Sequence, residues 1–502
     1  MTERTVISTV LALFCVCASA QTRTFERIVQ RNPWNAGSNV NGIRQDSISI
    51  SSAEIFAIYQ GGGLHRSNEA SEEVTAGAVA RTLLHLKRFS MKGEFSFSHF
   101  EGWDMCGSMF MENGTYPFDI IEFTPGRKTL QKYSFDGGIS YDLNPEWRIG
   151  GDIDFVSRNY SKRKDLRYTN YRLDLEVNPG ILWHKGRWAA GLNYIYQRDY
   201  ETLRGEVIGT ANSSYFAFLD KGMMYGTYGT WDSNGIHLAE SGINAFPVKR
   251  NTHGAAVQVQ YADAFAQISY RWGKGIAGEK QSLWFEFPGQ KINACAVWST
   301  GDDVRRHFIR LKYEWETVSN DESVLEKVTD GGITTTRKYS SNRIFTSEGF
   351  TLNPEYEYVS DKWELGVQGN IYKGWEISSQ IFPYLYAQNL TLWSVCLSGL
   401  VRFGNLALGA GACWEDGSWE EQQSQAEDSA GGTVEPFRLL EYSDIQREYE
   451  TTGKIGLELM LRYDVFKGLF VEAGGSWKHG FGFERYGNSR RWSGQLKLGY
   501  IF

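Results

Sequence analysis

Apolar and polar residues alternate along much of the chain from about residue 130 onward. The alternation is clearest in the segments 132–143, 147–158, 171–184 and 454–464. Because successive side chains of a β-strand point to opposite faces, this period of two predicts strands with one apolar and one polar face. The alternating stretches run for about 9–14 residues, longer than most strands of soluble sheets and long enough for a tilted membrane crossing.

The connections between these predicted strands alternate in length. Short turns are expected at 87–90, 144–146, 185–186, 262–264, 300–303, 360–362, 402–405 and 464–468. Long connections are expected near 101–130, 200–252, 273–283, 318–347, 415–449 and 479–491. One end with short turns and one end with long loops is typical of bacterial outer-membrane barrels, whose short turns lie in the periplasm. A soluble β-sandwich has no reason to keep such an asymmetry.

Aromatic residues gather beside both kinds of connection. Those next to short turns are Trp147, Trp183, Trp188, Trp298, Trp363 and Tyr463, and those next to long loops are Trp272, Trp375, Trp414, Trp477 and Trp492. Two aromatic belts are what two membrane–water interfaces favour. The final alternating segment closes on Phe502, which resembles the assembly signal of outer-membrane barrels. We therefore expect an all-β, transmembrane antiparallel barrel of about 18 strands (range 14–18) over residues 49–502.

Residues 1–20 have the features of a secretory signal peptide. Arg4 precedes the apolar run 6–17, and the small residues 18–20 offer a cleavage site before Gln21. The run is too short to span a bilayer as a helix, and no later stretch of roughly 18 apolar residues follows. We expect cleavage, export and insertion into the outer membrane, with segment 21–48 in the periplasm, from where it could enter the lumen.

Charge and cysteine content exclude several function classes. Asp and Glu number 59 against 52 Lys and Arg, and this acidic balance argues against a nucleic-acid partner. Beyond the signal peptide the cysteines are Cys106, Cys295, Cys396 and Cys413. None belongs to a C-x-x-C pair or a histidine cluster, so neither a zinc site nor a redox motif is predicted. We expect small strand residues and no cofactor, although a disulfide stays open for an exported protein.

The inward faces of the predicted strands carry charges of both signs. The candidate lumen-facing charges are Arg148, Asp152, Asp154, Arg158, Arg172, Asp174, Glu176, Lys454, Glu458 and Arg462. They could line a water-filled lumen that selects a polar solute. Alternatively, they form a network of paired charges that braces the wall or holds a plug. The mixture of signs favours the second interpretation.

Two predicted external loops are strongly charged. The basic loop contains Lys162, Arg163, Lys164 and Arg167. It could bind a substrate anion, but contact with the phosphates of lipopolysaccharide is the preferred interpretation because the loop meets the outer leaflet. The acidic segment 415–449 lacks the ligand spacing of a calcium site, so a solvated loop is expected there.

Two further loops, 103–118 and 215–231, are rich in Met, Phe, Tyr and Trp. Such segments do not lie extended in water. They could pack on each other over the barrel mouth, form a constriction, line a pocket for an apolar ligand, or cover a partner interface. The histidines of the external half, His99, His237, His253 and His479, show no pattern that couples one to a nucleophile, so no enzyme is predicted.

Three stretches suggest a family. They are Arg-Asn-Pro-Trp at 31–34, Tyr-Pro-Phe-Asp-Ile-Ile-Glu at 116–122 and Asn-Tyr-Ser-Lys-Arg-Lys-Asp-Leu-Arg at 159–167. The mature chain resembles a family of uncharacterised outer-membrane β-barrels from Gram-negative anaerobes that carries a domain-of-unknown-function label. The resemblance implies the barrel and its location, but no activity, substrate or catalytic residue.

The leading functional hypothesis is therefore passage or capture of a small solute across the outer membrane. Two alternatives stay open: a non-transporting scaffold or surface receptor that docks a protein through its external loops, and a membrane-embedded hydrolase. The expected partners are outer-membrane lipid, lipopolysaccharide and the outer-membrane assembly machinery, with a surface or periplasmic protein as a further possibility. Nucleic acid is not among them.

Overall fold

The computed structural model describes most of the chain. The described residues are 25, 29–45, 48–164, 166–206, 215–223, 226–232, 235–237, 246–279, 282–302, 304–378, 385–424, 439–466 and 468–502. The expected signal peptide, residues 1–20, lies outside them. Within the described residues, no helix is long and apolar enough to cross a membrane.

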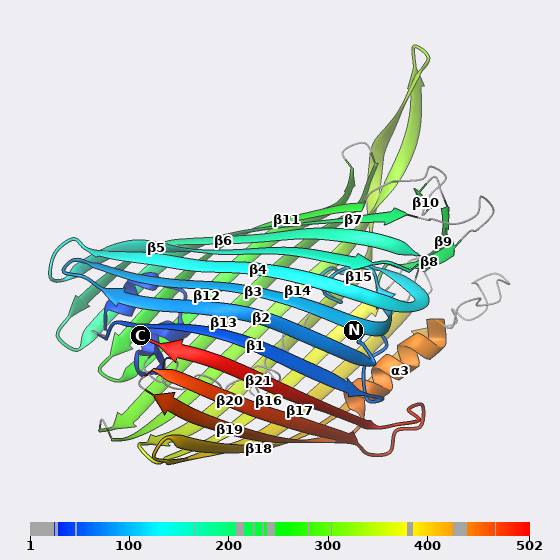
Figure 1. Cartoon of the computed structure of the whole chain (residues 1–502). Helices are drawn as coiled ribbons and strands as arrows, with labels where there is room; N and C mark the ends of the chain where they lie inside the picture. The colour runs from blue at the N-terminus through cyan, green and yellow to red at the C-terminus, as the bar shows by residue number, and fades with distance from the viewer. Residues whose placement is uncertain are drawn as a thin grey trace.

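Eighteen antiparallel strands close into a barrel (Figure 1). They are β1 (Ile50–Gly62), β2 (Glu72–His85), β3 (Phe89–Ser108), β4 (Asp119–Asp142), β5 (Trp147–Lys162), β6 (Arg167–Lys185), β7 (Trp188–Glu206), β11 (Phe246–Tyr261), β12 (Ala264–Glu279), β13 (Ser282–Gly301), β14 (Arg305–Asp330), β15 (Ile333–Ser360), β16 (Trp363–Ser378), β17 (Leu385–Phe403), β18 (Leu406–Ser424), β19 (Lys454–Phe466), β20 (Leu469–Gly480) and β21 (Arg490–Ile501). Each strand pairs with its neighbour in this order, and β1 pairs with β21 to close the ring. The predicted fold class is confirmed.

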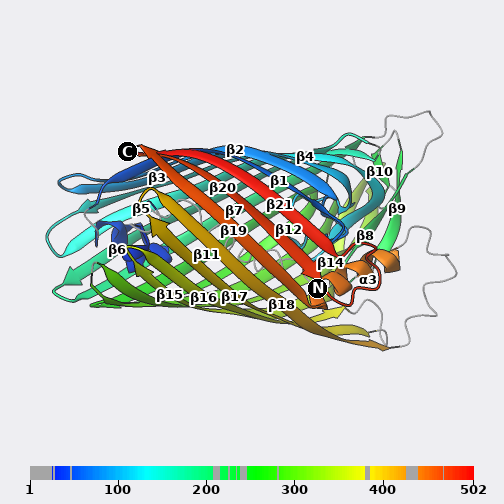
Figure 2. The same ribbon diagram turned by 60° about the horizontal axis from the view of Figure 1, so that its bottom comes forward.

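The remaining elements lie at the two ends of the barrel. They are the 3-10 helices η1 (Pro33–Ala36) and η2 (Val40–Gln45), the strands β8 (Tyr215–Asp220), β9 (Gly226–Asp232) and β10 (Gly235–His237), and the helix α3 (Leu439–Thr451). The 3-10 helices lie inside the barrel at the end with short turns, where the C-terminus also lies (Figure 2). At the opposite end, β8 pairs with the first residues of β4 and α3 lies beside the barrel mouth (Figure 1).

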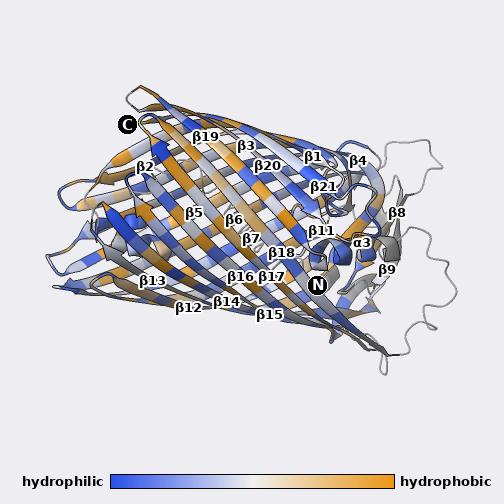
Figure 3. Ribbon diagram, turned by 90° about the horizontal axis from the view of Figure 1, so that it is seen from below, coloured by the Kyte–Doolittle hydropathy of each residue, from blue (hydrophilic) through white to orange (hydrophobic). Residues whose placement is uncertain are grey.

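The outer wall is apolar, as the alternation predicts. Leu457, Trp477 and Trp492 lie side by side on β19, β20 and β21 and are all exposed. Seen from below, apolar and polar residues alternate along each strand of the wall (Figure 3). Exposed tryptophans such as Trp147, Trp298 and Trp363 lie beside the short turns. An exposed apolar wall between two aromatic belts is the surface that a bilayer requires.

Two segments predicted as long loops are instead continuous strand. Residues 273–283 lie almost entirely in β12 and β13, and residues 318–347 form a hairpin of β14 and β15 that projects beyond the barrel mouth (Figure 1). The hairpin turns at Gly331 and Gly332, whose φ angles of 57° and 81° suit a tight turn with two left-handed residues. Its arms are rich in Thr, Ser and Val. Of these, Thr and Val favour strands even where apolar and polar residues do not alternate.

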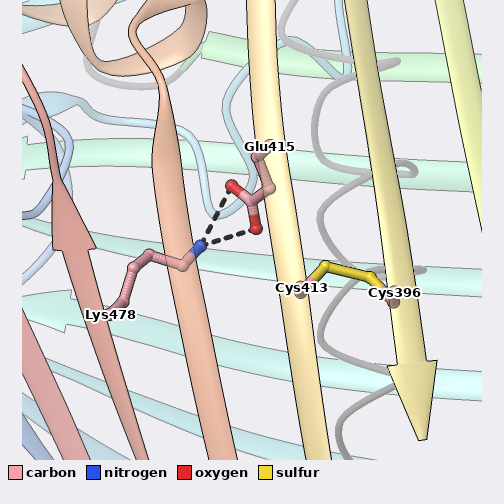
Figure 4. The surroundings of a disulfide bond; sticks show 4 residues. All are labelled: Cys396, Cys413, Glu415 and Lys478. Carbon is pink, nitrogen blue, oxygen red and sulfur yellow. Dashed lines mark hydrogen bonds and ion pairs between the residues drawn. A yellow bond between two sulfur atoms is a disulfide. The ribbon is translucent and has the colours of Figure 1, made fainter.

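A disulfide joins β17 and β18 on the inner wall (Figure 4). Cys396 and Cys413 stand directly opposite each other in the register of these strands. Nearby, the Lys478 ammonium and the Glu415 carboxylate form an ion pair with an N–O distance of 2.9 Å. Cys106 and Cys295 are free thiols. The preferred expectation of scattered small residues is therefore wrong for one pair of cysteines, because register brings together side chains that are 17 residues apart.

Candidate functional site: a charged chamber in the lumen

The N-terminal segment forms a floor across the lumen. Pro33 starts η1, and the Asn32 side chain accepts a hydrogen bond from the backbone N–H of Trp34. The Trp34 ring is 1% exposed and packs against Phe265 and Val297 of the β12–β13 wall, while its indole N–H donates to Gln260. A tryptophan whose ring is buried and whose N–H has a partner is a strong anchor.

Asparagine side chains fix the rest of this floor. Asn39 donates to the Gln258 side chain at 3.1 Å, and Asn41 donates to the carbonyl of Gly180 at 2.9 Å. Ile43 packs in a separate cluster on the β1–β2 side of the barrel. The floor therefore bridges the β1–β2 wall and the β12–β13 wall, which lie on opposite sides of the ring.

Residues 109–118, which connect β3 and β4, form a roof over the lumen at the end opposite the floor. Its apolar side chains turn inward and are almost completely buried: Met109, Phe110, Tyr116 and Phe118. The ring of Phe118 stacks on Phe285 of β13 at 4.9 Å. The loop folds inward against the wall, and its buried cluster includes Ala217 and Leu219 of the other apolar segment, so the two segments also pack on each other. Both arrangements remove apolar surface from water. In the other apolar segment, the side chains from 227 to 231 lie outside the described residues.

Two carboxylates fix the roof to the wall: Glu201 belongs to the wall and Glu112 to the roof. Glu201 of β7 accepts hydrogen bonds from the backbone N–H of Met111 at 3.0 Å and from the Tyr116 hydroxyl at 3.2 Å. Burial, reinforced by the charge of Glu201, raises the pKa of Tyr116 well above its ordinary value, so the hydroxyl keeps the proton that it donates. Glu112, in the roof itself, points down to Arg158 and Arg172 at 3.2 Å each.

A polar chamber lies beneath the roof, against the β4–β14 wall. Its volume is about 1320 Å³, including open lumen. The cations that line it are Lys132, Arg158, Arg172, Arg250, Arg271 and Lys291, and the lining carboxylates are Glu112 and Glu316. The chamber wall is therefore rich in cationic groups that face a hydrated space.

Most of these cations have a carboxylate partner, on a neighbouring strand or farther around the ring. Arg250 pairs with Asp199 at 2.6 Å, and Arg271 pairs with Glu176 at 2.8 Å. Lys132 differs, because no carboxylate lies within ion-pair distance of its ammonium among the residues that the structure describes.

Three cations stand in one row of the wall. Lys132, Arg158 and Arg172 are directly opposite one another on β4, β5 and β6. Like charges in such positions destabilise a sheet unless an anion lies between them. Asp174 contacts Arg158 at 2.7 Å and Arg172 at 3.1 Å from the wall, while Glu112 reaches both arginines from the roof.

The candidate charges from the sequence fall into three groups. Arg158, Arg172, Asp174 and Glu176 line or border the chamber. Arg148, Asp152 and Asp154 lie farther down β5 towards the short turns, where Arg148 pairs with Asp142 at 3.1 Å and Asn178 donates to Asp152 at 3.1 Å. Lys454, Glu458 and Arg462 lie on β19, outside the chamber.

On β19 the charged side chains serve local contacts. The Lys454 ammonium donates to the carbonyls of Tyr449 and Glu450 at the end of α3, where a cation is favourable. Arg462 pairs with Asp464 at 3.1 Å. These two contacts agree with the bracing network that the mixed signs favour, whereas the chamber combines bracing with a hydrated cationic surface.

The predicted basic loop requires a correction. Lys162 is not in a loop: it ends β5, is 2% exposed and pairs with Glu122 at 2.6 Å inside the barrel mouth. Its place in the alternation directs the side chain inward, so it cannot reach lipopolysaccharide. Arg163 and Lys164 are exposed, and Arg167, which starts β6, is half-buried.

The family model described as a family of unknown function (DUF6850) matches residues 42–502. The chain belongs to this family. The predicted resemblance is thereby confirmed. No curated protein matches the DUF6850 chain.

Several solved structures are similar at low identity. A mutant of the ferric enterobactin receptor PfeA from Pseudomonas aeruginosa has a TM-score of 0.40 and 10% identity, and the match covers 90% of this chain and 80% of that one. The siderophore receptor PiuA from Acinetobacter baumannii has a TM-score of 0.40 and 8% identity, with 91% and 82% covered. The unliganded ferric citrate transporter FecA has a TM-score of 0.39 and 7% identity, with 91% and 79% covered.

Sequence patterns missed half of the chamber. Arg250 falls within a segment predicted as a loop, and Arg271 and Lys291 lie in strands whose inward faces were not assigned. Glu112 lies in a loop noted only for its apolar residues. A signal for Glu112 exists: it is the single charged residue between Gly107 and Phe118, and a buried apolar segment that carries one charge must provide that charge with a partner.

Three of the described histidines contact neighbouring side chains. His85 contacts the Ser90 hydroxyl at 2.9 Å, but Ser90 is completely buried and also accepts a hydrogen bond from Arg44. His253 contacts the Tyr194 hydroxyl, and His479 packs on Trp477. Within the described residues, no group of three or more His, Cys, Asp and Glu side chains could hold a metal ion.

Proposed function

We propose that this protein is an outer-membrane barrel that takes up a small polar solute, which it holds in the chamber between roof 109–118 and floor 29–45. The chamber carries the proposal: a hydrated, charged space lies between two internal segments that the chain itself provides. Roof and floor act as the gates through which the solute passes.

The outer-membrane location is part of this proposal. The exposed apolar wall between two aromatic belts supports contact with lipid, and the exposed Arg163 and Lys164 support contact with lipopolysaccharide phosphates. The scaffold alternative has less support, because Phe110, Tyr116 and Phe118 are buried in the lumen and present no apolar surface to a partner.

Conductance in planar bilayers tests the uptake function. We expect small or intermittent current steps from the native barrel, because roof and floor narrow the lumen. Replacing residues 110–117 by a short Gly-Ser linker should produce steady ohmic steps. Combining this change with Trp34→Ala, which loosens the floor, should raise the conductance further.

The control shortens a different external element. Removing residues 326–337 trims the projecting β14–β15 hairpin, which does not line the chamber, and should leave the native current unchanged. Silence in every variant, with folding verified by heat-modifiable electrophoretic mobility, would refute the uptake function.

Phe502, which follows β21, supports a further partner, the outer-membrane assembly machinery. Phe502 is 73% exposed, its backbone N–H donates to the carbonyl of Ser51, and its ring packs on Tyr500. An exposed terminal aromatic ring remains accessible for recognition during insertion. Deleting Phe502 should lower the yield of folded protein in outer-membrane fractions, whereas Phe502→Tyr should retain most of it. Equal yields from the deletion and the native chain would contradict this role.

A further inference from the structure

The roof carries its own anion into the cationic row of the chamber. The two carboxylate oxygens of Glu112 divide between Arg158 and Arg172, each at 3.2 Å, and Arg172 also donates to Thr115 of the roof at 3.3 Å. Glu112 is not sealed off, because its side chain is 33% exposed to the chamber. One carboxylate on two guanidinium groups is the arrangement by which proteins recognise carboxylate ligands.

The charges around Glu112 keep it ionised. Burial alone would raise its pKa, but Arg158 and Arg172 outweigh burial and lower the pKa below its ordinary value. At neutral pH the Glu112 carboxylate is therefore ionised, and its negative charge binds the roof to the two arginines.

Among the described residues, one cation of the row stands apart from the ion pairs of the other two. Beside the two arginines stands Lys132, whose ammonium has no carboxylate within ion-pair distance among the described residues and faces the same space. Arg250 lines the chamber from β11 and also acts electrostatically on Glu112. A second negative group in the chamber would therefore meet Lys132, whose ammonium Glu112 does not contact within ion-pair distance.

We propose that Glu112 occupies the position of a substrate carboxylate, and that a small dicarboxylate displaces it from Arg158 and Arg172 and releases the roof. One carboxylate of the substrate replaces Glu112, and the second lies near Lys132. The inference rests on the proposed uptake function and names its substrate class. Since Glu112 and the substrate compete for the same guanidinium groups, occupancy of the chamber and the contacts of Glu112 with Arg158 and Arg172 exclude each other.

Succinate binding to the purified full-length barrel in detergent, measured by isothermal titration calorimetry, tests the competition. Glu112→Gln keeps the size of the side chain but removes its charge, so this variant should bind succinate about tenfold more tightly than the native chain. Lys132→Met should weaken binding by about tenfold for loss of one charge-assisted contact. The matched control, Glu286→Gln on β13, alters a carboxylate that pairs with Lys274 and Lys338 outside the chamber and should not change the affinity.

Bilayer currents provide the second readout. Succinate should increase the current through the native barrel, while Glu112→Gln should show the raised current without succinate. If Glu112→Gln binds succinate no better than the native chain, the competition is refuted. If inorganic phosphate binds more tightly than succinate in both proteins, the carboxylate class is wrong.

The two proposals fail in different ways. A barrel that conducts after roof replacement, but binds no succinate in any variant, overturns the dicarboxylate and leaves uptake intact. A folded barrel that stays silent even without its roof overturns uptake itself.

Discussion

Replacing Leu459 with arginine is expected to destabilise the folded barrel by about 2–4 kcal/mol, the cost of a cation on the lipid face near the bilayer midplane. Leu459 is 71% exposed on β19, and it lies between the level of Trp477, which pairs with Leu457, and that of Tyr463 near the short turn. Its side chain has no inward alternative, because the inward positions beside it are occupied by Glu458 and Met460. Urea titration of the purified variant, followed by heat-modifiable mobility, measures the loss.

A separate variant with an arginine elsewhere on the same face is the control for depth in the membrane. Tyr463→Arg places the charge in the belt near the short turn, where the cost falls to about 0–1 kcal/mol. Leu459→Phe should have little effect because it keeps an apolar side chain in hydrocarbon. Equal destabilisation by the arginines at 459 and 463 would contradict the assignment of the midplane.

The barrel could be predicted from sequence because its strands carry the signal locally. Segment 454–464 alternates over its whole length, and β19 runs over Lys454–Phe466. Lipid on one side and water on the other impose the period of two on every crossing, so no knowledge of distant neighbours is required. The short turns follow for the same reason, since each lies between two such segments.

Alternation fails where both faces of a strand meet water. The outer part of the β14–β15 hairpin projects beyond the barrel mouth (Figure 1), where lipid does not select apolar residues on one face, so its sequence does not alternate. The sequence also did not decide whether the Cys396–Cys413 disulfide forms, for a different reason. Its formation depends on the register between β17 and β18, which the residues of either strand alone do not fix.

The chamber shows the same limit for function. The alternation assigns Arg158 and Arg172 to the inward faces of their strands. It does not predict that Lys132 stands beside them, or that Glu112 reaches them from a loop, because these contacts depend on register and on a tertiary fold of the roof. The error for Lys162 has a related cause: its loop assignment ended β5 too early, and an inward side chain was taken for a surface cation.

Glu122→Gln is expected to destabilise the barrel mouth by about 3–5 kcal/mol, because it removes the negative partner that two buried ammonium groups share among the described residues. Lys162 contacts Glu122 at 2.6 Å and Lys128 contacts it at 3.4 Å, and all three side chains are 0% exposed. Lys128 also donates to the carbonyls of Cys106 and Ser108, at the base of the roof. Losing the negative charge of Glu122 should make the roof accessible to protease and lower the urea concentration at which half of the barrel is unfolded.

The control for this cluster is Lys162→Met. Two ammonium groups and one carboxylate leave an excess positive charge in the native barrel, so removing Lys162 leaves a neutral Glu122–Lys128 pair and a side chain of similar length in the same space. We expect a much smaller loss of stability than for Glu122→Gln, with the roof still resistant to protease. Equal losses would show that the packing of these chains, rather than the balance of their charges, holds the roof in place.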